Sequence, residues 1–116
     1  MDFAYDPQNV FARILRGEIP AKVAYENEHA LAFHDVRPQA PVHLLVVPKG
    51  PYVSLDHFAA EAPAAEQAGF LAAVAEVCRL ERLEADFRAI ANTGAHGHQG
   101  VPHFHVHILG GRPLGP

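Results

Sequence analysis

Apolar and polar residues alternate most regularly near the C-terminal end of the chain, over residues 103–109. Three large apolar residues stand at the even-numbered positions there, and three histidines stand at the odd-numbered positions. Because successive side chains of a strand point to opposite faces, the alternation predicts a strand with one buried face and one histidine-bearing face. Two glycines at residues 110–111 predict its end. The histidines of this row are His103, His105 and His107, and the apolar residues are Phe104, Val106 and Ile108.

The rest of the chain divides into short apolar strands and helices with one apolar face. Asn9 is a good N-cap for a short helix, and apolar residues recur every three or four positions along a later, longer one. The strand over residues 42–48 is almost wholly apolar, with His43 as its one polar interior residue. The expected elements are a helix over 10–16, strands over 23–26, 30–34 and 42–48, a helical turn over 54–58, a helix over about 63–83, and a strand over 87–92.

This order of elements predicts an α+β fold. Short connections between consecutive strands favour hairpins, so we expect a five-stranded antiparallel sheet. The long helix and the short N-terminal helix are expected to pack on it, with the helices on one face. His43 should then lie beside the strand that carries His105.

Composition excludes several classes of partner. The 116 residues carry a net charge of −4, without a cluster of Lys and Arg, which argues against nucleic acid or an anionic membrane as partner. The single Cys78 can form neither an internal disulfide nor a cysteine-rich zinc site. Residues 1–7 lack the basic start and apolar core of a signal peptide, and no apolar run approaches the ~20 residues of a membrane span. We therefore expect a cytoplasmic protein of one domain.

The spacing of the histidine row limits its chemistry. Strand residues two apart are about 6.7 Å apart, and residues four apart about 13 Å. A metal ion holds imidazole nitrogens at about 2 Å, so two of these histidines, but hardly all three, could bind one ion. A phosphate group suits the row better, because imidazole can attack phosphorus, donate a proton or hydrogen-bond an oxygen. The glycine-rich loop over residues 94–100 lets backbone N–H groups approach a phosphate, and Asp35 offers a carboxylate for ribose hydroxyls.

These residues give the chain a resemblance to the histidine triad (HIT) family. The run His-Phe-His-Val-His-Ile-Leu fits the family pattern His-x-His-x-His-x-x, in which x is apolar. Residues 11–22, 32–36, 38–43 and 46–49 follow the order of its Hint branch, the nucleoside phosphoramidases. The resemblance covers nearly the whole chain and implies a single HIT domain over residues 1–116. It also implies a homodimer built by the long helix and by pairing of sheet edges.

The resemblance further implies a purine nucleoside monophosphate or its phosphoramidate as ligand, cleaved through a nucleotidyl-histidine on His105. His107 and His43 would lie beside the phosphate, and His103 would order the row. Protonated imidazoles and N–H groups would stabilise the phosphoryl charge, so neither a metal nor a cofactor is implied. The residues expected to contact the nucleotide are Phe11, Ile14, Ile19 and Phe33 at the base, Asp35 and Val36 at the ribose, and Asn92, Gln99, Gly100 and Val101 at the phosphate.

The chain departs from the Hint pattern in the loop before the row. Gly100 stands where Hint enzymes commonly carry a serine, whose hydroxyl can donate to the leaving nitrogen or the phosphate. We expect weaker protonation of an amine leaving group as a result. His96 and His98 are additions to a loop that is normally small and acidic, and they are expected to be solvated side chains or to attract an anionic leaving group.

Three other functions stay open on the sequence. A dinucleoside polyphosphate hydrolase of the Fhit-like branch would use the same nucleophile with another leaving group. A three-histidine metal site could be formed by His43, His103 and His105. A nucleotide-binding interaction module could have lost its catalysis.

Overall fold

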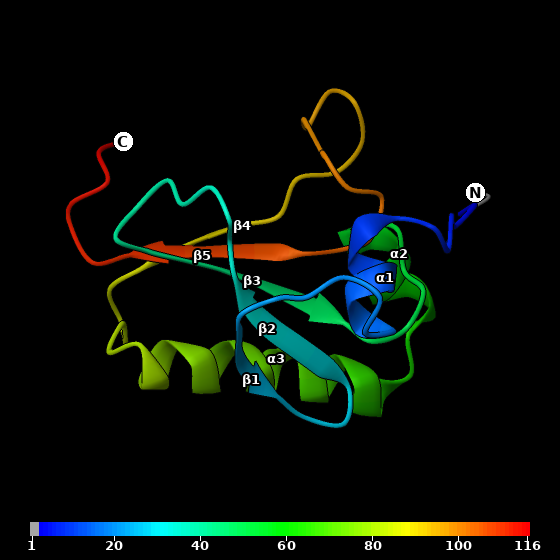
Figure 1. The fold of residues 1–116 in the computed structure, drawn as a ribbon, viewed down its shortest axis with the longest axis horizontal. Coiled ribbons are helices and arrows are strands. Elements are labelled where there is room, and N and C mark those ends of the chain that lie inside the picture. Colours follow the sequence, from blue (N-terminus) through cyan, green and yellow to red (C-terminus); the bar gives the residue numbers. More distant parts are fainter. Residues whose placement is uncertain (1–2) are drawn as a thin grey trace.

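The computed structural model describes residues 3–116 (Figure 1). Met1 and Asp2 lie outside the described residues. They belong to the segment over residues 1–7 that lacks the pattern of a signal peptide. Within residues 3–116, no helix is long and apolar enough to span a membrane. The elements in chain order are α1 (Val10–Leu15), β1 (Val23–Glu26), β2 (Ala30–His34), β3 (Val42–Pro48), α2 (Leu55–Glu61), α3 (Ala64–Leu80), β4 (Arg88–Ile90) and β5 (Val106–Gly110).

The strands form one five-stranded antiparallel sheet in the order β1-β2-β3-β5-β4. The predicted α+β class and its antiparallel sheet are confirmed. Strands β3 and β5 are neighbours, with His43 opposite Leu109 and Leu45 opposite His107. This register brings the polar residue of β3 beside the histidine-bearing strand, as predicted.

The helices lie on both faces of the sheet, so the prediction of helices on one face is wrong. Helix α3 runs along one face, where Phe70, Ala73 and Val77 are buried (Figure 1). Helix α1 covers part of the other face through Phe11, which belongs to a second buried cluster. The reason is visible in β2 and β3, whose residues are buried at almost every position. Strands that are apolar on both sides need cover on both sides.

The strand predicted over residues 103–109 is shorter than expected. Strand β5 begins at Val106, and residues 103–105 precede it outside the β-ladder. Phe104 donates its backbone N–H to the Tyr52 carbonyl at 2.7 Å instead of to a neighbouring strand. The alternation of sides nevertheless holds, since Phe104 packs among the phenylalanines on the α3 side while His105 meets Phe11 on the α1 side.

The helix predictions differ from the structure mainly at their ends. The N-cap at Asn9 is confirmed, because its side chain accepts a hydrogen bond from the Ala12 amide. The turn predicted over residues 54–58 is a longer helix, α2, capped by Ser54. Helix α3 ends at Leu80 rather than near Leu83, which instead packs in the core.

Candidate active site

The predicted histidines gather on the α1 side of the sheet, where β3 and β5 lie side by side. The rings of His105 and His107 are 5.1 Å apart, and those of His43 and His107 are 5.2 Å apart. His43 and His105 are buried, and His107 is partly exposed. The structure thus brings three of the four predicted histidines into one cluster and places the fourth, His103, behind them.

His103 is the most deeply buried member of the row, with no exposed surface. Its Nε2 lies 2.8 Å from the Pro48 carbonyl, which can only accept, so Nε2 carries the proton. Its Nδ1 is then an acceptor and receives the Tyr5 hydroxyl at 2.7 Å. Both ring nitrogens are occupied within the protein, and His103 has none left for a ligand.

His105 has one nitrogen held by the backbone and one left free. Its Nδ1 lies 2.7 Å from the His103 carbonyl, so the proton is on Nδ1. Nε2 therefore presents a lone pair, as an imidazole nucleophile requires. The ring also packs edge-on against Phe11, with centroids 5.0 Å apart. The hydrogen bond fixes the tautomer, and the aromatic contact fixes the ring orientation.

His43 and His107 are hydrogen-bonded to each other. This bond leaves the proton of His107 on Nε2, whereas the proton of His105 is on Nδ1. The backbone N–H of Gln39 donates to His43 Nδ1 at 3.0 Å, so His43 carries its proton on Nε2. That Nε2 lies 3.0 Å from His107 Nδ1 and 3.4 Å from an Asp35 carboxylate oxygen. By accepting at Nδ1, His107 keeps its own proton on Nε2. The cluster thus holds a lone pair on His105 beside an N–H donor on His107.

Burial makes the triad histidines weak bases. It lowers the pKa of His103 to about 4 and that of His107 to about 4, and it lowers the pKa of His105 as well. Mutual repulsion adds to the shift of His107, because a charge on His105 or His43 would disfavour its own. In the free protein at neutral pH the triad is therefore uncharged. In this uncharged state, His107 offers an N–H donor on its Nε2.

The ligand atoms that could hold a metal ion belong to Asp35, His43 and His107, which lie within 4.8 Å of one another. This group differs from the trio of His43, His103 and His105 considered from the sequence. His103 is not part of this group, since its two nitrogens lie on the Tyr5 hydroxyl and the Pro48 carbonyl. Two imidazoles and a carboxylate are a donor set that several divalent metals accept.

The residues expected around the base and ribose divide into buried and accessible ones. Phe11 and Phe33 are core residues in mutual edge contact, so they back the histidines rather than line an open surface. Val36 is 92% exposed. Asp35 is held rigid, since one carboxylate oxygen accepts the Arg37 amide.

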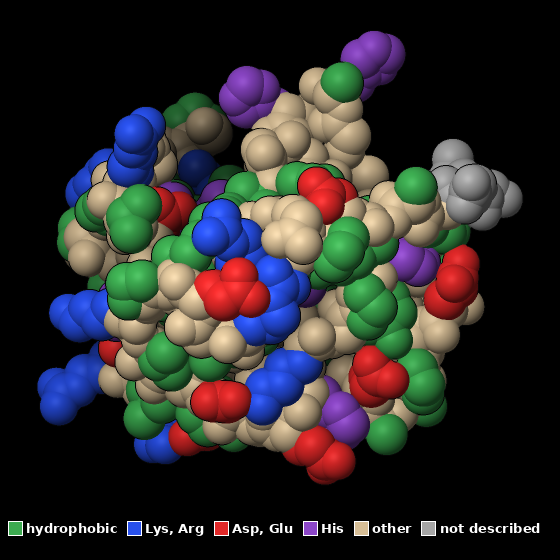
Figure 2. Space-filling model, turned by 45° about the vertical axis from the view of Figure 1, so that its right-hand side comes forward, with side chains coloured by type: hydrophobic (Ala, Val, Ile, Leu, Met, Phe, Trp, Pro, Cys, Tyr) green, Lys and Arg blue, Asp and Glu red, His purple; other side chains and the backbone are tan. Residues whose placement is uncertain are grey.

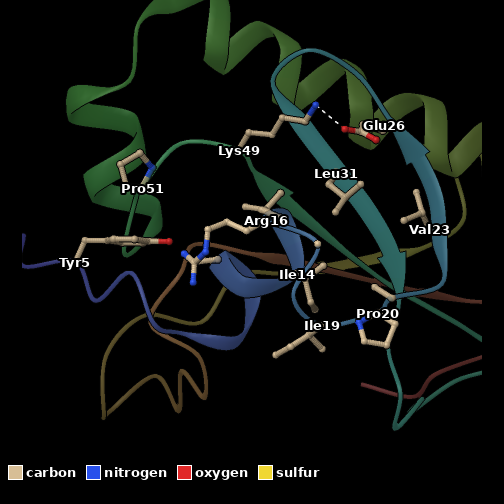
Figure 3. A pocket seen from close by; sticks show the side chains of 14 residues that line it. Tyr5, Ile14, Arg16, Ile19, Pro20, Val23, Glu26, Leu31, Lys49 and Pro51 are labelled. Atoms are coloured by element: carbon tan, nitrogen blue, oxygen red, sulfur yellow. Dashed lines mark ion pairs between the residues drawn. The ribbon is translucent and has the colours of Figure 1, made fainter.

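A pocket lies beside α1, lined by residues of that helix and of the segment that follows it (Figure 3). It measures about 630 Å³ and contains Ile14 and Ile19 from the expected base-binding set, but none of the clustered histidines. Figure 3 shows Tyr5 and Pro51 at one side of this pocket and Val23 at the other. Ile14 also packs against the buried cluster that contains Phe11 and Phe33, so the expected base-binding residues lie partly in this pocket and partly in the core beside it.

The loop before the histidine row is organised by the side chain of Gln99. Its amide nitrogen donates to the carbonyls of Val53 and Val101, and its oxygen accepts the Gly94 amide. Both polar ends of the Gln99 side chain are thus hydrogen-bonded within the protein. Gly100 lies in open space, and Asn92 and Val101 are partly exposed near it. His96 and His98 are exposed, and Figure 2 shows histidine side chains protruding from this loop.

Two residues that hydrogen-bond to the histidines could not be predicted from the sequence. Tyr5 lies in a segment that the sequence marks only as a loose start, and its bond to His103 spans 98 positions. Gln39 acts through its backbone, which no side-chain pattern can reveal. A phenol is a suitable hydrogen-bond donor for a buried histidine, but the sequence does not indicate that Tyr5 lies beside His103.

Comparison with known proteins gives one consistent result. The family model of the HIT domain matches residues 16–114. An uncharacterised 13.2 kDa HIT-like protein of Azospirillum brasilense is 58% identical over 113 residues, covering 97% of this chain and 93% of that protein. The purine nucleoside phosphoramidase of Escherichia coli K12 is 39% identical over 112 residues, covering 94% and 92%. A histidine triad protein structure from Clostridium difficile superposes with a TM-score of 0.83 at 35% identity, covering 97% and 98%.

Proposed function

This chain belongs to the HIT domain family, and we propose that it is a single-domain hydrolase of purine nucleoside 5′-phosphoramidates. The similarity to a purine nucleoside phosphoramidase supports this choice of substrate class. The observation that carries the proposal is the tautomer of His105. Its Nδ1–H is held by the His103 carbonyl, so Nε2 is free to attack phosphorus.

In the proposed first step, His105 Nε2 attacks the α-phosphorus of the phosphoramidate. A bond forms between Nε2 and phosphorus, the P–N bond to the amine breaks, and the amine leaves after gaining a proton from solvent water. In the second step, water attacks the nucleotidyl-histidine and gives up a proton to the solvent, the bond to Nε2 breaks, and the nucleoside monophosphate is released. The reaction needs no oxidant or reductant.

The neighbouring groups have complementary roles in this scheme. His107 Nε2–H would donate to a phosphoryl oxygen, held in place by the relay from the Gln39 amide through His43. Asp35 would accept ribose hydroxyls, with the exposed Val36 beside the sugar. Backbone N–H groups near Gly100 and Val101 would meet the phosphate, while His103 orders the row from behind.

Trapping the covalent intermediate tests the proposal. The protein is mixed with adenosine 5′-phosphoramidate, quenched under alkaline conditions, and examined by mass spectrometry for one added adenylyl group, located on His105. His105→Ala should lose both the adduct and turnover while still binding AMP. His96→Ala, an exposed histidine outside the cluster, should keep both. A His105→Ala variant that still turns over the substrate would refute the mechanism. A wild-type protein that binds AMP without any turnover would be an interaction module.

The leaving group is a separate question within the same mechanism. Turnover of adenosine 5′-phosphoramidate and diadenosine triphosphate should be compared in parallel under identical conditions. We expect the phosphoramidate to be preferred. A preference for the dinucleotide would assign the chain to the alternative function, a dinucleoside polyphosphate hydrolase.

A metal site is a second candidate function, favoured by the convergence of Asp35, His43 and His107. The test is metal analysis of protein purified without a histidine tag. Stoichiometric zinc that is lost on chelation together with activity would support this function. Full phosphoramidase activity in protein free of metal would support the metal-independent reaction proposed above.

We also propose that the chain forms a homodimer. The apolar hollow of about 340 Å³ between α2, α3 and β4 exposes Leu55 and Leu71, which are 48% and 66% accessible. Strand β4 ends the sheet on that side and leaves one edge unpaired within the described chain. An exposed apolar surface next to an open sheet edge suits a second copy related by a twofold axis.

A further inference from the structure

The N-terminal segment reaches the histidine row through Tyr5. The Tyr5 hydroxyl donates to His103 Nδ1 at 2.7 Å, and the two rings meet edge to face at 5.6 Å. This is a specific hydrogen bond, because the Pro48 carbonyl fixes the His103 proton on Nε2 and leaves Nδ1 as an acceptor. Without the hydroxyl, Nδ1 would be a buried acceptor with no partner, which is unfavourable.

The backbone of His103 controls the tautomer of His105. Its carbonyl accepts the Nδ1–H of His105 at 2.7 Å. Residues 103–105 lie outside the ladder of β5, so regular sheet hydrogen bonds do not hold this carbonyl in place. Two anchors remain, the Phe104 amide on the Tyr52 carbonyl and the ring of His103. The ring is fixed at both nitrogens only while Tyr5 is present.

The residues that follow Tyr5 are hydrogen-bonded to both ends of α1. The Asp6 carbonyl accepts from the side chain of Asn9, which also caps α1. The Arg16 guanidinium donates to the Pro7 carbonyl at 2.7 Å. Figure 3 shows the hydroxyl end of Tyr5 directed towards α1. The segment is thus part of the folded unit, and burial raises the pKa of Tyr5, which keeps the phenol in its donating form.

We propose that Tyr5 is a positioning residue for the reaction, acting through His103 to hold His105 with its Nε2 lone pair free. This inference rests on the proposed function, since it assumes that His105 is the nucleophile. Tyr5 does not touch the reacting atoms. Its loss should therefore lower kcat more than it changes KM, because binding of the nucleotide is left intact while the fraction of correctly oriented His105 falls.

The test compares Tyr5→Phe with Tyr25→Phe. Tyr25 is the control, because it lies on β1 and packs on the α3 side of the sheet, outside the histidine cluster. With adenosine 5′-phosphoramidate, Tyr5→Phe should reduce kcat about fivefold, the equivalent of one net hydrogen bond, with KM within twofold. Tyr25→Phe should leave kcat unchanged. Equal kcat in Tyr5→Phe and the wild type would overturn the proposal.

A spectroscopic readout separates this inference from the proposed function. Long-range ¹H–¹⁵N spectra of the histidine rings report tautomers without any substrate. The wild type should show His103 protonated on Nε2 and His105 protonated on Nδ1, whereas Tyr5→Phe should show His105 in a mixture of tautomers. A wild type with His103 protonated on Nδ1, or an unchanged His105 in Tyr5→Phe, would overturn the inference. Absence of turnover with the expected tautomers would count against the proposed function alone.

Discussion

At the scale of a single residue, Gly100 is the position where one added group should most improve the proposed reaction. A Cβ built at Gly100 meets no atom within 4 Å, and the residue does not have a positive φ, so a larger side chain fits. Gly100→Ser adds a hydroxyl donor for the leaving nitrogen or the phosphate. One hydrogen bond to a charged group contributes about 1.5 kcal/mol, or about tenfold in rate. We expect kcat for adenosine 5′-phosphoramidate to rise by about this factor.

Gly100→Ala is the matched control, since it adds the same Cβ without the hydroxyl. Its kcat should equal that of the wild type. If alanine and serine raise turnover equally, the effect comes from stiffening the loop and not from a donor. No increase with serine would show that this hydroxyl does not limit the reaction.

Residue identities in the cluster could be predicted from the sequence, but their proton positions could not. The alternation over residues 103–109 indicates which histidines share a side, and the apolar context of His43 indicates a special role. The tautomers depend on partners distant in sequence, such as Tyr5 on His103 and Pro48 on the same ring. They also depend on backbone groups, such as the Gln39 amide. Burial, which lowers the pKa of the triad histidines, likewise follows only from the packed fold.

At the scale of elements, Gly111 ends β5 in a conformation that other residues disfavour. Its φ is +94°, and an added Cβ would lie 3.0 Å from the Cβ of Pro41, in the segment that leads to His43. Gly111→Ala should therefore combine backbone strain with a tight contact. We expect a loss of about 2 kcal/mol in the free energy of unfolding, measured by urea denaturation.

Gly17→Ala separates the backbone strain at Gly111 from its tight contact with Pro41. Gly17 has a similar φ of +78°, but a Cβ added there would meet no atom within 4 Å, so alanine adds strain alone. Its loss of stability should be about 1 kcal/mol, and the difference between the variants measures the Pro41 contact. Equal losses would mean that Pro41 moves aside without cost.

The elements themselves follow closely from the sequence, whereas their arrangement follows less completely. Strands β1, β2 and β3 have the predicted bounds, because turn residues and prolines limit them locally. The face that α1 covers could not be predicted from its own residues, since its apolar stripe fits either face of a sheet. The two-sided burial of β2 and β3 decides the matter, and it could have been inferred from their unbroken apolar runs.

At the scale of the whole molecule, the buried triad makes stability depend on pH. His103 has a pKa of about 4 in the folded protein, against an ordinary value of 6.5. Between these values the unfolded chain binds a proton that the folded one does not, so the free energy of unfolding falls as pH falls from 6.5 to 4. For this fully buried ring the loss is about 3 kcal/mol, and His107 acts in the same direction. Urea denaturation at a series of pH values measures it.

His103→Gln should flatten this pH dependence. Glutamine offers an amide donor for the Pro48 carbonyl but no group that titrates. His96→Gln is the matched control, because His96 is exposed, and it should keep the wild-type slope. A slope that is unchanged in His103→Gln would assign the pH dependence to other groups.

The proposed dimer makes Leu71 the position where one charge should separate two copies. Leu71 is 66% exposed on α3 and lines the apolar hollow beside the open edge of β4. A glutamate there would be buried without a partner in the dimer, at a cost of about 3 kcal/mol, or more than a hundredfold in dissociation constant. Sedimentation equilibrium should show a wild-type mass of twice 12.6 kDa and a Leu71→Glu mass of one chain.

Ala72→Glu adds the same charge to an exposed α3 position outside the hollow and should stay dimeric. A monomeric wild type, or a dimeric Leu71→Glu, would mean that this surface does not join two copies, and the open edge of β4 would then need another partner.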